Sequence, residues 1–310
     1  MPTQTFSSFE DFYDANRHSS LRHMLLGPKR GNWVLTYLIA NNLSLQWGQE
    51  GAKSLVEGAT RLGGITIFLP TQNPSALTGN GRRFDEFSLM TVRPGDEFCL
   101  SATDWRHWAS LYIPNEVVAS ANRDATAAIG LMTGVVQLPP NRIGRFRSVV
   151  EQLGVVVQRA AAAFESVAAL KVVERKLVQE IRNVLVMKHE VEHTHGPHVV
   201  PRRQIICMAM DFFDQHDGEY LSVEQLATAA GVSERTLRDA FQQQFGIAPV
   251  QYLKLRTLHQ VRRALKSADP SVKTVTEIAT QFGVWQFGRC AHDYRLLFGE
   301  FPSETLRHQC

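Results

Sequence analysis

Two short stretches near the end of the chain carry side chains that could hydrogen-bond the edges of DNA bases. Arginine and glutamine can each make two hydrogen bonds to one base, and arginine and lysine also bind phosphates without reading sequence. Apolar residues recur within each stretch at steps of three and four, which predicts two helices with one polar face each. The candidate DNA-binding residues are Ser233, Glu234, Arg235, Arg238, Gln242, Trp285, Gln286, Arg289, His292 and Arg295.

These candidates lie in a degenerate repeat. Residues 223–232 reappear 52 residues later as residues 275–284, and residues 245–249 reappear 53 residues later as residues 298–302. Each copy has the pattern of a short helix, a glycine turn and a second helix. This is the pattern of a helix-turn-helix, which places its second helix in the major groove of DNA. Two such units would read two successive grooves.

Local signals predict where the helices of the repeat begin. Ser222 and Ser233 are suitable N-caps for helices over residues 223–229 and 234–245. Thr274, with Glu277 three residues later, has the spacing of a capping box. Gly231 stands where a sharp turn needs a positive φ, which glycine adopts without strain. The second recognition helix is expected over residues 285–298, with four buried residues: Phe287, Tyr294, Leu297 and Phe298.

A long helix is expected to join the two units. Pro249 is suited to its first turn. An apolar stripe follows at helical spacing, at Tyr252, Leu255, Leu258, Val261 and Leu265. Five basic residues are then left on the outer side, where they could meet phosphates: Lys254, Arg256, Arg262, Arg263 and Lys266.

The first part of the chain has a different pattern. Short β-rich runs cover residues 33–39, 43–47, 65–69, 87–92 and 109–113, whereas residues 9–24 indicate a short helical or irregular segment. Several short strands predict an antiparallel barrel or jelly roll. The expected fold class is therefore α+β and multidomain, with an N-terminal cupin-like β-barrel with helices and a C-terminal all-α domain.

The expected domains are a β-rich effector-binding-like domain (1–140), paired helices (141–188), a linker (189–203) and the DNA-binding domain (204–310). The apolar stripe of the paired helices includes Val156 and Val167 and could either cover the barrel or pair with a second subunit. The linker holds four histidines, but no spacing puts two of them on one helix face with a third ligand nearby, and Gly196-Pro197 breaks a helix, so a solvated segment is favoured over a metal site.

Composition narrows the classes of protein. The chain has 310 residues, 44% of them apolar, and a net charge of +3, so DNA binding must depend on where the cations lie. The N-terminus does not resemble a signal peptide and no apolar run reaches membrane length. The four cysteines are scattered, which favours a reduced cytoplasmic location. We expect no metal or other cofactor.

Residues 223–307 resemble the C-terminal domain of the AraC/XylS family of bacterial transcription regulators. The most specific part is residues 278–302, with two departures: Val284 replaces the usual phenylalanine or tyrosine, and Cys290 stands where phenylalanine is common. The resemblance implies seven helices, binding to double-stranded DNA, and an activator that contacts RNA polymerase. The N-terminal part is loosely similar to the family's effector-binding domains, nearest to the ethanolamine-operon-regulator branch, which implies an unidentified small-molecule effector and a possible homodimer.

Aromatic residues of the β-rich part could line an effector pocket or simply form the core. The candidates are Trp33, Tyr37, Trp47, Arg61 and Trp108. An enzyme is the alternative class, but the chain lacks the nucleophile-elbow, zinc-protease, phosphate-loop and dinucleotide motifs. The densest polar cluster, residues 104–107, is expected in a loop between strands. A ligand-independent architectural protein or repressor is the other alternative. We therefore expect a ligand-responsive DNA-binding regulator rather than an enzyme.

Overall fold

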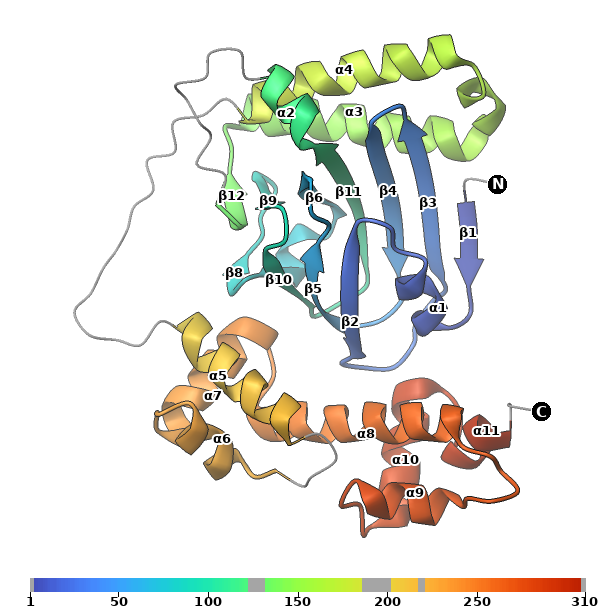
Figure 1. The fold of residues 1–310 in the computed structure, drawn as a ribbon, viewed down its shortest axis with the longest axis vertical. Coiled ribbons are helices and arrows are strands. Elements are labelled where there is room, and N and C mark those ends of the chain that lie inside the picture. The colour runs from blue at the N-terminus through green and yellow to red at the C-terminus, as the bar shows by residue number, and fades with distance from the viewer. Residues whose placement is uncertain (1–2, 122–131, 186–201, 217–220, 308–310) are drawn as a thin grey trace. The chain divides into compact units, whose positions relative to one another are not determined.

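The computed structural model describes residues 3–121, 132–185, 202–216 and 221–307 (Figure 1). The chain divides into two compact units. The N-terminal unit comprises Met1–His23, Arg30–Gly51 and Val56–Thr194, and the C-terminal unit comprises Met24–Lys29, Ala52–Leu55 and His195–Cys310. Of the expected linker, residues 189–201 lie outside the described residues, and Arg202 and Arg203 begin a helix.

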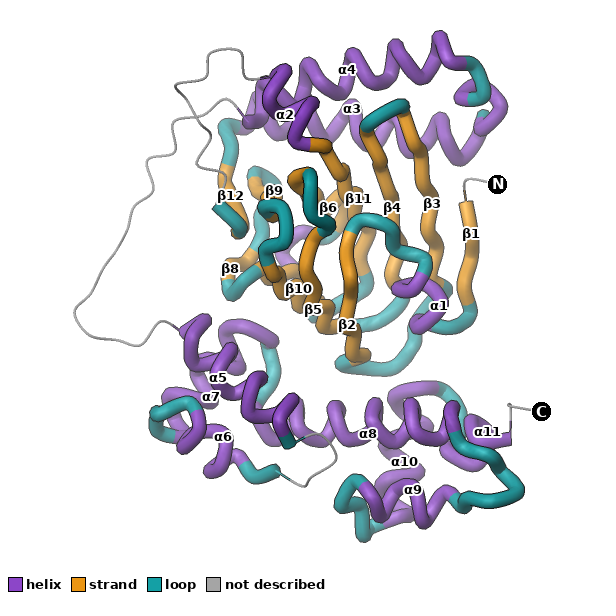
Figure 2. The backbone as a smooth tube through the Cα atoms, viewed as in Figure 1, coloured by secondary structure: helices purple, strands orange, loops and turns teal. Residues whose placement is uncertain are grey.

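Strands dominate the N-terminal unit, and the described part of the C-terminal unit is almost entirely helical (Figure 2). The larger sheet has the order β1 (Thr3–Phe6), β3 (Trp33–Ala40), β4 (Leu43–Glu50), β11 (Arg106–Pro114), β6 (Gly64–Gln72), β9 (Ser88–Val92) and β12 (Gly134–Gln137), with every neighbouring pair antiparallel. The smaller sheet has the order β2 (Ser19–Leu25), β5 (Ser54–Thr60), β10 (Glu97–Ala102), β7 (Leu77–Gly79) and β8 (Arg82–Arg83). Within the described residues these are two separate sheets, so the sheet-rich prediction is confirmed but barrel closure is not.

The two faces of the larger sheet differ in chemistry because side chains alternate along a strand. Leu111 of β11 pairs with Leu45 of β4 and Ile67 of β6, and all three belong to one apolar core. Ser110 and Thr66, one position away, therefore point to the opposite face. That second face carries Ser110, Thr66 and Gln46 together with Phe68.

Two helices cover the apolar face: α3 (Pro140–Arg159) and α4 (Val167–Leu185) (Figure 1). Val150, Val157, Leu177 and Ile181 pack into the core with the sheet. Val156 and Val167 of the predicted stripe are exposed, so they do not cover the sheet, and their pairing with a second subunit stays a prediction. The buried residues of α3 are Ile143, Phe146, Val150, Gly154 and Val157.

The five predicted strands correspond to β3, β4, β6, β9 and β11, while the other strands were not expected. Residues 9–24 form α1 (Phe9–Asp14) and most of β2, so the expectation of an irregular segment there is wrong for β2. A further helix, α2 (Asn115–Ala121), follows β11. A turn over Arg93–Asp96 precedes β10: the Asp96 amide donates to the Arg93 carbonyl at 3.1 Å, and Gly95 has φ 74°.

The described part of the C-terminal unit contains seven helices. They are α5 (Arg202–Gln215), α6 (Val223–Ala229), α7 (Glu234–Phe245), α8 (Pro249–Ser267), α9 (Val275–Gln281), α10 (Phe287–Phe298) and α11 (Pro302–Arg307) (Figure 1). The bounds of α6 and α7 are those expected from the sequence. A search of the described helices found none with the length and apolar character needed to cross a bilayer.

Candidate nucleic-acid interface

The first helix-turn-helix begins both of its helices with side-chain caps. The Ser222 hydroxyl accepts from the Gln225 amide at 3.2 Å, and the Gln225 side chain accepts from the Ser222 amide at 2.8 Å. Ser233 accepts from the Thr236 amide at 3.2 Å and so caps α7. Gly231 has φ 64°, a left-handed conformation that glycine adopts without strain. The predicted caps and turn are confirmed.

Helix α7 separates a buried face from a solvent face. Leu237, Phe241 and Phe245 are fully buried. The rings of Phe241 and Phe245 lie 5.4 and 5.2 Å from the ring of Tyr252 on α8, which orients the helix. The residues on the opposite face are exposed, together with the capping serine: Ser233, Glu234, Arg235, Arg238 and Gln242.

The second helix-turn-helix repeats this construction with one difference. Thr274 accepts from the Glu277 amide at 3.2 Å, and Glu277 accepts from the Thr274 amide at 2.8 Å, as predicted. Helix α10, however, begins at Phe287 rather than at residue 285, and its N-cap residue Gln286 makes no side-chain capping bond. Phe287 is exposed, not buried as expected. Side chains of a helix point toward its N-terminus, so one in the first turn extends past the residues that could cover it.

The predicted contact residues of the second helix-turn-helix are also exposed: Trp285, Gln286, Arg289, His292 and Arg295. The indole of Trp285 is 73% exposed, which is unusual for a large apolar ring. The guanidinium of Arg295 lies 4.5 Å above the ring of Phe301, at the far end of α10. Trp285 lies just before this helix and Arg289 in its first turn, at the end that reads bases in helix-turn-helix proteins.

Helix α8 connects the two helix-turn-helix motifs of the C-terminal unit. A buried arginine of α8 holds the second motif in place. Arg262 was expected outside but is 8% exposed. Its guanidinium donates to Glu300 at 2.5 Å and to the Tyr294 hydroxyl at 3.3 Å, and lies 4.7 Å from the Phe298 ring. Position 262 is four residues after buried Leu258 and three before buried Leu265, so it faces the same partner. Burial raises the pKa of Tyr294 to about 12.

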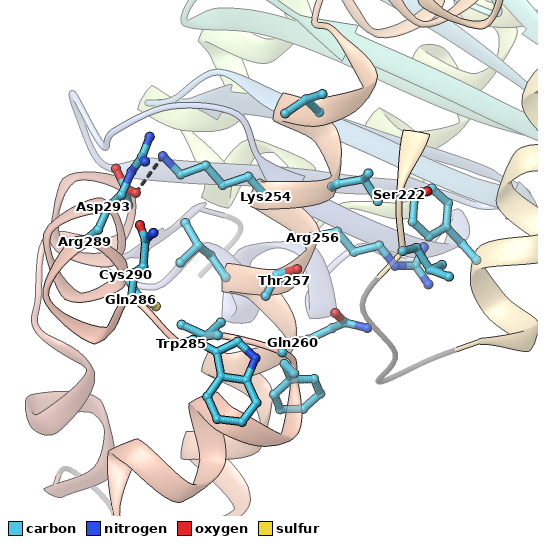
Figure 3. Close-up of a pocket in the computed structure, with 18 of the residues that line it drawn as sticks. Ser222, Lys254, Arg256, Thr257, Gln260, Trp285, Gln286, Arg289, Cys290 and Asp293 are labelled. Carbon is cyan, nitrogen blue, oxygen red and sulfur yellow. Dashed lines mark ion pairs between the residues drawn. The ribbon is translucent and has the colours of Figure 1, made fainter. Parts of the chain in front are cut away.

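A groove of about 810 Å³ brings three of the candidates close to α8. Trp285, Gln286 and Arg289 line it from the start of α10, and Lys254 and Arg256 line it from α8 (Figure 3). Ser222, at the N-terminus of α6, belongs to the same groove. The candidates on α7 do not line it, so α7 presents a separate exposed face.

The two basic residues that line the groove from α8 each contact a neighbouring side chain, which restricts the position of the charged group. Lys254 makes an ion pair of 2.6 Å with Asp293, drawn as a dashed line in Figure 3. The Arg256 guanidinium lies 4.7 Å over the Phe213 ring. Of the other expected phosphate-binding residues on α8, Arg263 and Lys266 are exposed. A DNA strand along this face would meet exposed cations at Lys254, Arg263 and Lys266.

The five candidate effector-binding residues do not line one common cavity. Trp108 lines a small cavity inside the N-terminal unit, whereas the other four candidates do not. Trp47 is on the apolar face, where its indole donates to the Val150 carbonyl at 3.0 Å. Trp33 is buried, the Tyr37 ring lies under the Arg17 guanidinium, and Arg61 is exposed.

Sequence reasoning missed two charged residues of this cavity. Glu50 and Arg106 form a buried ion pair of 2.7 Å, and both line the cavity. Arg106 was expected in a loop but is the first residue of β11. It is two positions from Trp108, so strand alternation could have assigned both to one face. Among the described residues, no group of three or more histidine, cysteine, aspartate or glutamate side chains could hold a metal ion.

Comparison with known proteins finds similarity mainly in the C-terminal third. Residues 226–308 match a helix-turn-helix domain family. The chain is 40% identical over 103 residues to a probable thc operon regulatory protein of Rhodococcus erythropolis, covering 33% of this chain and 31% of that protein. It is 38% identical over 101 residues to the XylDLEGF operon transcriptional activator of Pseudomonas putida, covering 33% and 31%. The match thus spans about a third of the length of these curated relatives.

Solved structures also match this chain. A probable AraC family transcriptional regulator from Rhodopseudomonas palustris is 31% identical, with a TM-score of 0.31, and the match covers 34% of this chain and 95% of that one. The AraC-like activator CuxR is 15% identical with a TM-score of 0.39, covering 75% and 82%.

Proposed function

We propose that the whole protein is a sequence-specific DNA-binding regulator of the AraC type, because residues 226–308 match a helix-turn-helix domain family and about a third of the chain is similar to operon regulators. Its helices α7 and α10 would enter two successive major-groove segments. Arg235, Arg238 and Arg289 would contact bases, and the exposed cations of α8 would contact phosphates.

The observation that carries this proposal is the exposure of one polar face on each of two equivalent helices. All ten candidate contact residues are exposed, while the apolar faces of both helices are buried. The helix between them has 19 residues, which at a rise of ~1.5 Å per residue gives about 28 Å. This is near the ~34 Å between successive major-groove faces. The spacing therefore suits two grooves on one side of the duplex.

Selection of DNA sites from a random pool tests the proposal. The full-length protein is used at near-physiological salt, because weak phosphate contacts dominate at low salt. We expect a motif with two blocks roughly 10–11 base pairs apart, one for each reading helix. Recovery of no motif, together with binding that only salt can abolish, would refute sequence-specific reading and favour an architectural role.

The N-terminal unit supplies regulation in this proposal. We infer that its two facing sheets form an effector-binding domain of cupin-like type and that residues 141–188 serve as its dimerisation helices. Exposed Val155 and Val172 on α3 and α4 support a contact with a second copy. We further propose activation through contact with RNA polymerase, in the cytoplasm. The support is that the Pseudomonas putida relative is an operon activator.

The assignment of domains remains part of this proposal. Residues 1–140 would bind the effector, 141–188 would pair two subunits, 189–203 would link the units and 204–310 would bind DNA. Analytical ultracentrifugation of the full chain tests the pairing step. A monomer at micromolar concentration, with and without operator DNA, would contradict it.

A further inference from the structure

The N-terminal unit encloses a cavity on the polar face of its larger sheet. Its volume is about 50 Å³, and at roughly 10–15 Å³ per water-sized atom it has room for a body of only a few atoms. Its wall includes apolar side chains from four strands: Val56, Phe68, Met90 and Leu100. Such a wall favours an apolar body, and the polar groups of the cavity must then decide its orientation.

Glu50 is held by three donors, which also fix its charge in place. Its Oε1 accepts from the Arg106 Nη2 at 2.7 Å and from the Trp108 indole at 2.8 Å, and its Oε2 accepts from the Tyr13 hydroxyl at 2.6 Å. The Glu50 and Arg106 side chains are 2% and 1% exposed. A buried ion pair of this kind needs further hydrogen bonds to offset desolvation, and Glu50 has them.

Arg106 lacks such further hydrogen bonds. Its Nε and Nη1 are buried and have no hydrogen-bond partner among the described residues, and the same holds for the Thr66 hydroxyl. Both residues line the cavity. A buried N–H without an acceptor is costly, so each such group in a folded protein calls for an explanation. A ligand oxygen in the cavity would supply the missing acceptor.

The charge balance of the cavity decides which oxygen fits. Glu50 already neutralises Arg106. The imidazole of His18, which also lines the cavity, is hydrogen-bonded to Ser110 and Ser44 at 2.8 Å each. Burial, with Arg61 and Arg17 nearby, lowers the pKa of His18 to about 3, so it is neutral at pH 7. A ligand carboxylate would therefore add an uncompensated negative charge beside Glu50, in a medium that screens charge poorly.

We propose that this cavity is the effector site and that it takes a small uncharged molecule with an amide-type or ketone-type carbonyl and a short apolar body. The carbonyl oxygen accepts from the free N–H groups of Arg106, and the apolar body contacts Phe68 and Met90. This inference rests on the proposed role of the N-terminal unit as an effector domain. It adds the chemical class of the effector and the residue that recognises it.

Matched pairs of probes test the class. Binding of acetamide, propionamide and isobutyramide to the full-length protein is compared with binding of acetate, propionate and isobutyrate, by ligand-observed NMR at millimolar concentration. The two members of a pair have nearly the same shape and differ in charge. We expect at least one amide to bind roughly tenfold or more tightly than its carboxylate, a difference of about 1.4 kcal/mol. Absence of binding by all three amides, or a preference for the carboxylates, would overturn the proposal.

A charge-neutralising variant sharpens the test. Glu50→Gln can keep all three hydrogen bonds, with Oε1 accepting from Arg106 and Trp108 and the new amide donating to Tyr13. It removes the negative charge, so the free Arg106 should now favour the carboxylate of each pair. Glu86→Gln, at an exposed position, is the matched control and should keep the preference for amides. An unchanged preference in Glu50→Gln would show that Arg106 does not recognise the ligand.

DNA binding separates a failure of this inference from a failure of the proposed function. The same preparations are tested for binding to a selected operator. If the operator is bound and no amide is, the effector class is wrong and the regulator assignment stands. If an amide binds in the cavity and no DNA motif is recovered, the ligand site stands and the regulatory function is wrong.

Discussion

Replacing Arg262 by alanine should destabilise the second helix-turn-helix far more than replacing its neighbour Arg263. The Arg262 guanidinium is almost fully buried, with an ion pair to Glu300 and a ring contact to Phe298. Removing one partner of a buried pair costs about 3–5 kcal/mol. Because the Glu300 side chain is 26% exposed and also accepts from Thr305 at 2.7 Å, water and that hydroxyl can partly satisfy it, so we expect a loss of about 3 kcal/mol.

The loss should be local, which determines the assay. In hydrogen exchange followed by mass spectrometry on the full chain, amides of α10 and α11 should exchange faster in Arg262→Ala, while those of α6 and α7 keep their protection. Urea unfolding of the same variant gives the free energy. Arg263→Ala removes the same charge from an exposed position and should change stability by within about 0.5 kcal/mol. Equal losses in the two variants would refute the structural role assigned to Arg262.

Four further outcomes are expected. Arg289→Ala should cost about 1–3 kcal/mol of operator-binding free energy and relax the preference at one base position, as gel-shift titrations would measure. Lys266→Ala should instead weaken binding to all DNA sequences alike and lower the salt slope by about 1. Unchanged site preference in Arg289→Ala would contradict the base contact. Ser233→Ala removes the α7 cap and should cost about 1 kcal/mol in urea unfolding, and no loss would argue against the cap. Because the pKa of His18 is about 3 when folded and near 6.5 when unfolded, the stability of the N-terminal unit should be full above pH 6.5 and fall by up to ~1.4 kcal/mol per pH unit between pH 6.5 and 3. A His18→Gln variant should lose this slope, and an unchanged pH profile of unfolding would count against a buried neutral imidazole.

Features set by a few neighbouring residues could be predicted from the sequence. Ser222 and Thr274 cap helices through groups three residues away, and Gly231 provides a positive φ at a turn, so the sequence alone predicts all three. The exposure of the candidate residues on α7 and α10 also follows from helical periodicity.

Features set by distant partners were not predictable in the same way. Arg262 was assigned to solvent because its residue type is usually exposed, and only Glu300, 38 positions away, explains its burial. The buried role of Arg106 likewise depends on Glu50, which is 56 positions away on another strand. Strands such as β1 and β10 have too little apolar alternation to be recognised, since pairing with other strands defines them.

The helices α7 and α10 differ in their N-terminal capping, and this difference affects how DNA discrimination changes with temperature. The first turn of α7 is ordered by Ser233 before any DNA arrives, whereas the first turn of α10 has no side-chain cap at Gln286. A turn that frays in the free protein must lose conformational entropy when it settles in a groove, and this cost grows in proportion to absolute temperature. On warming, the half of the operator read by α10 should therefore lose discrimination first, and the protein would still hold the half read by α7.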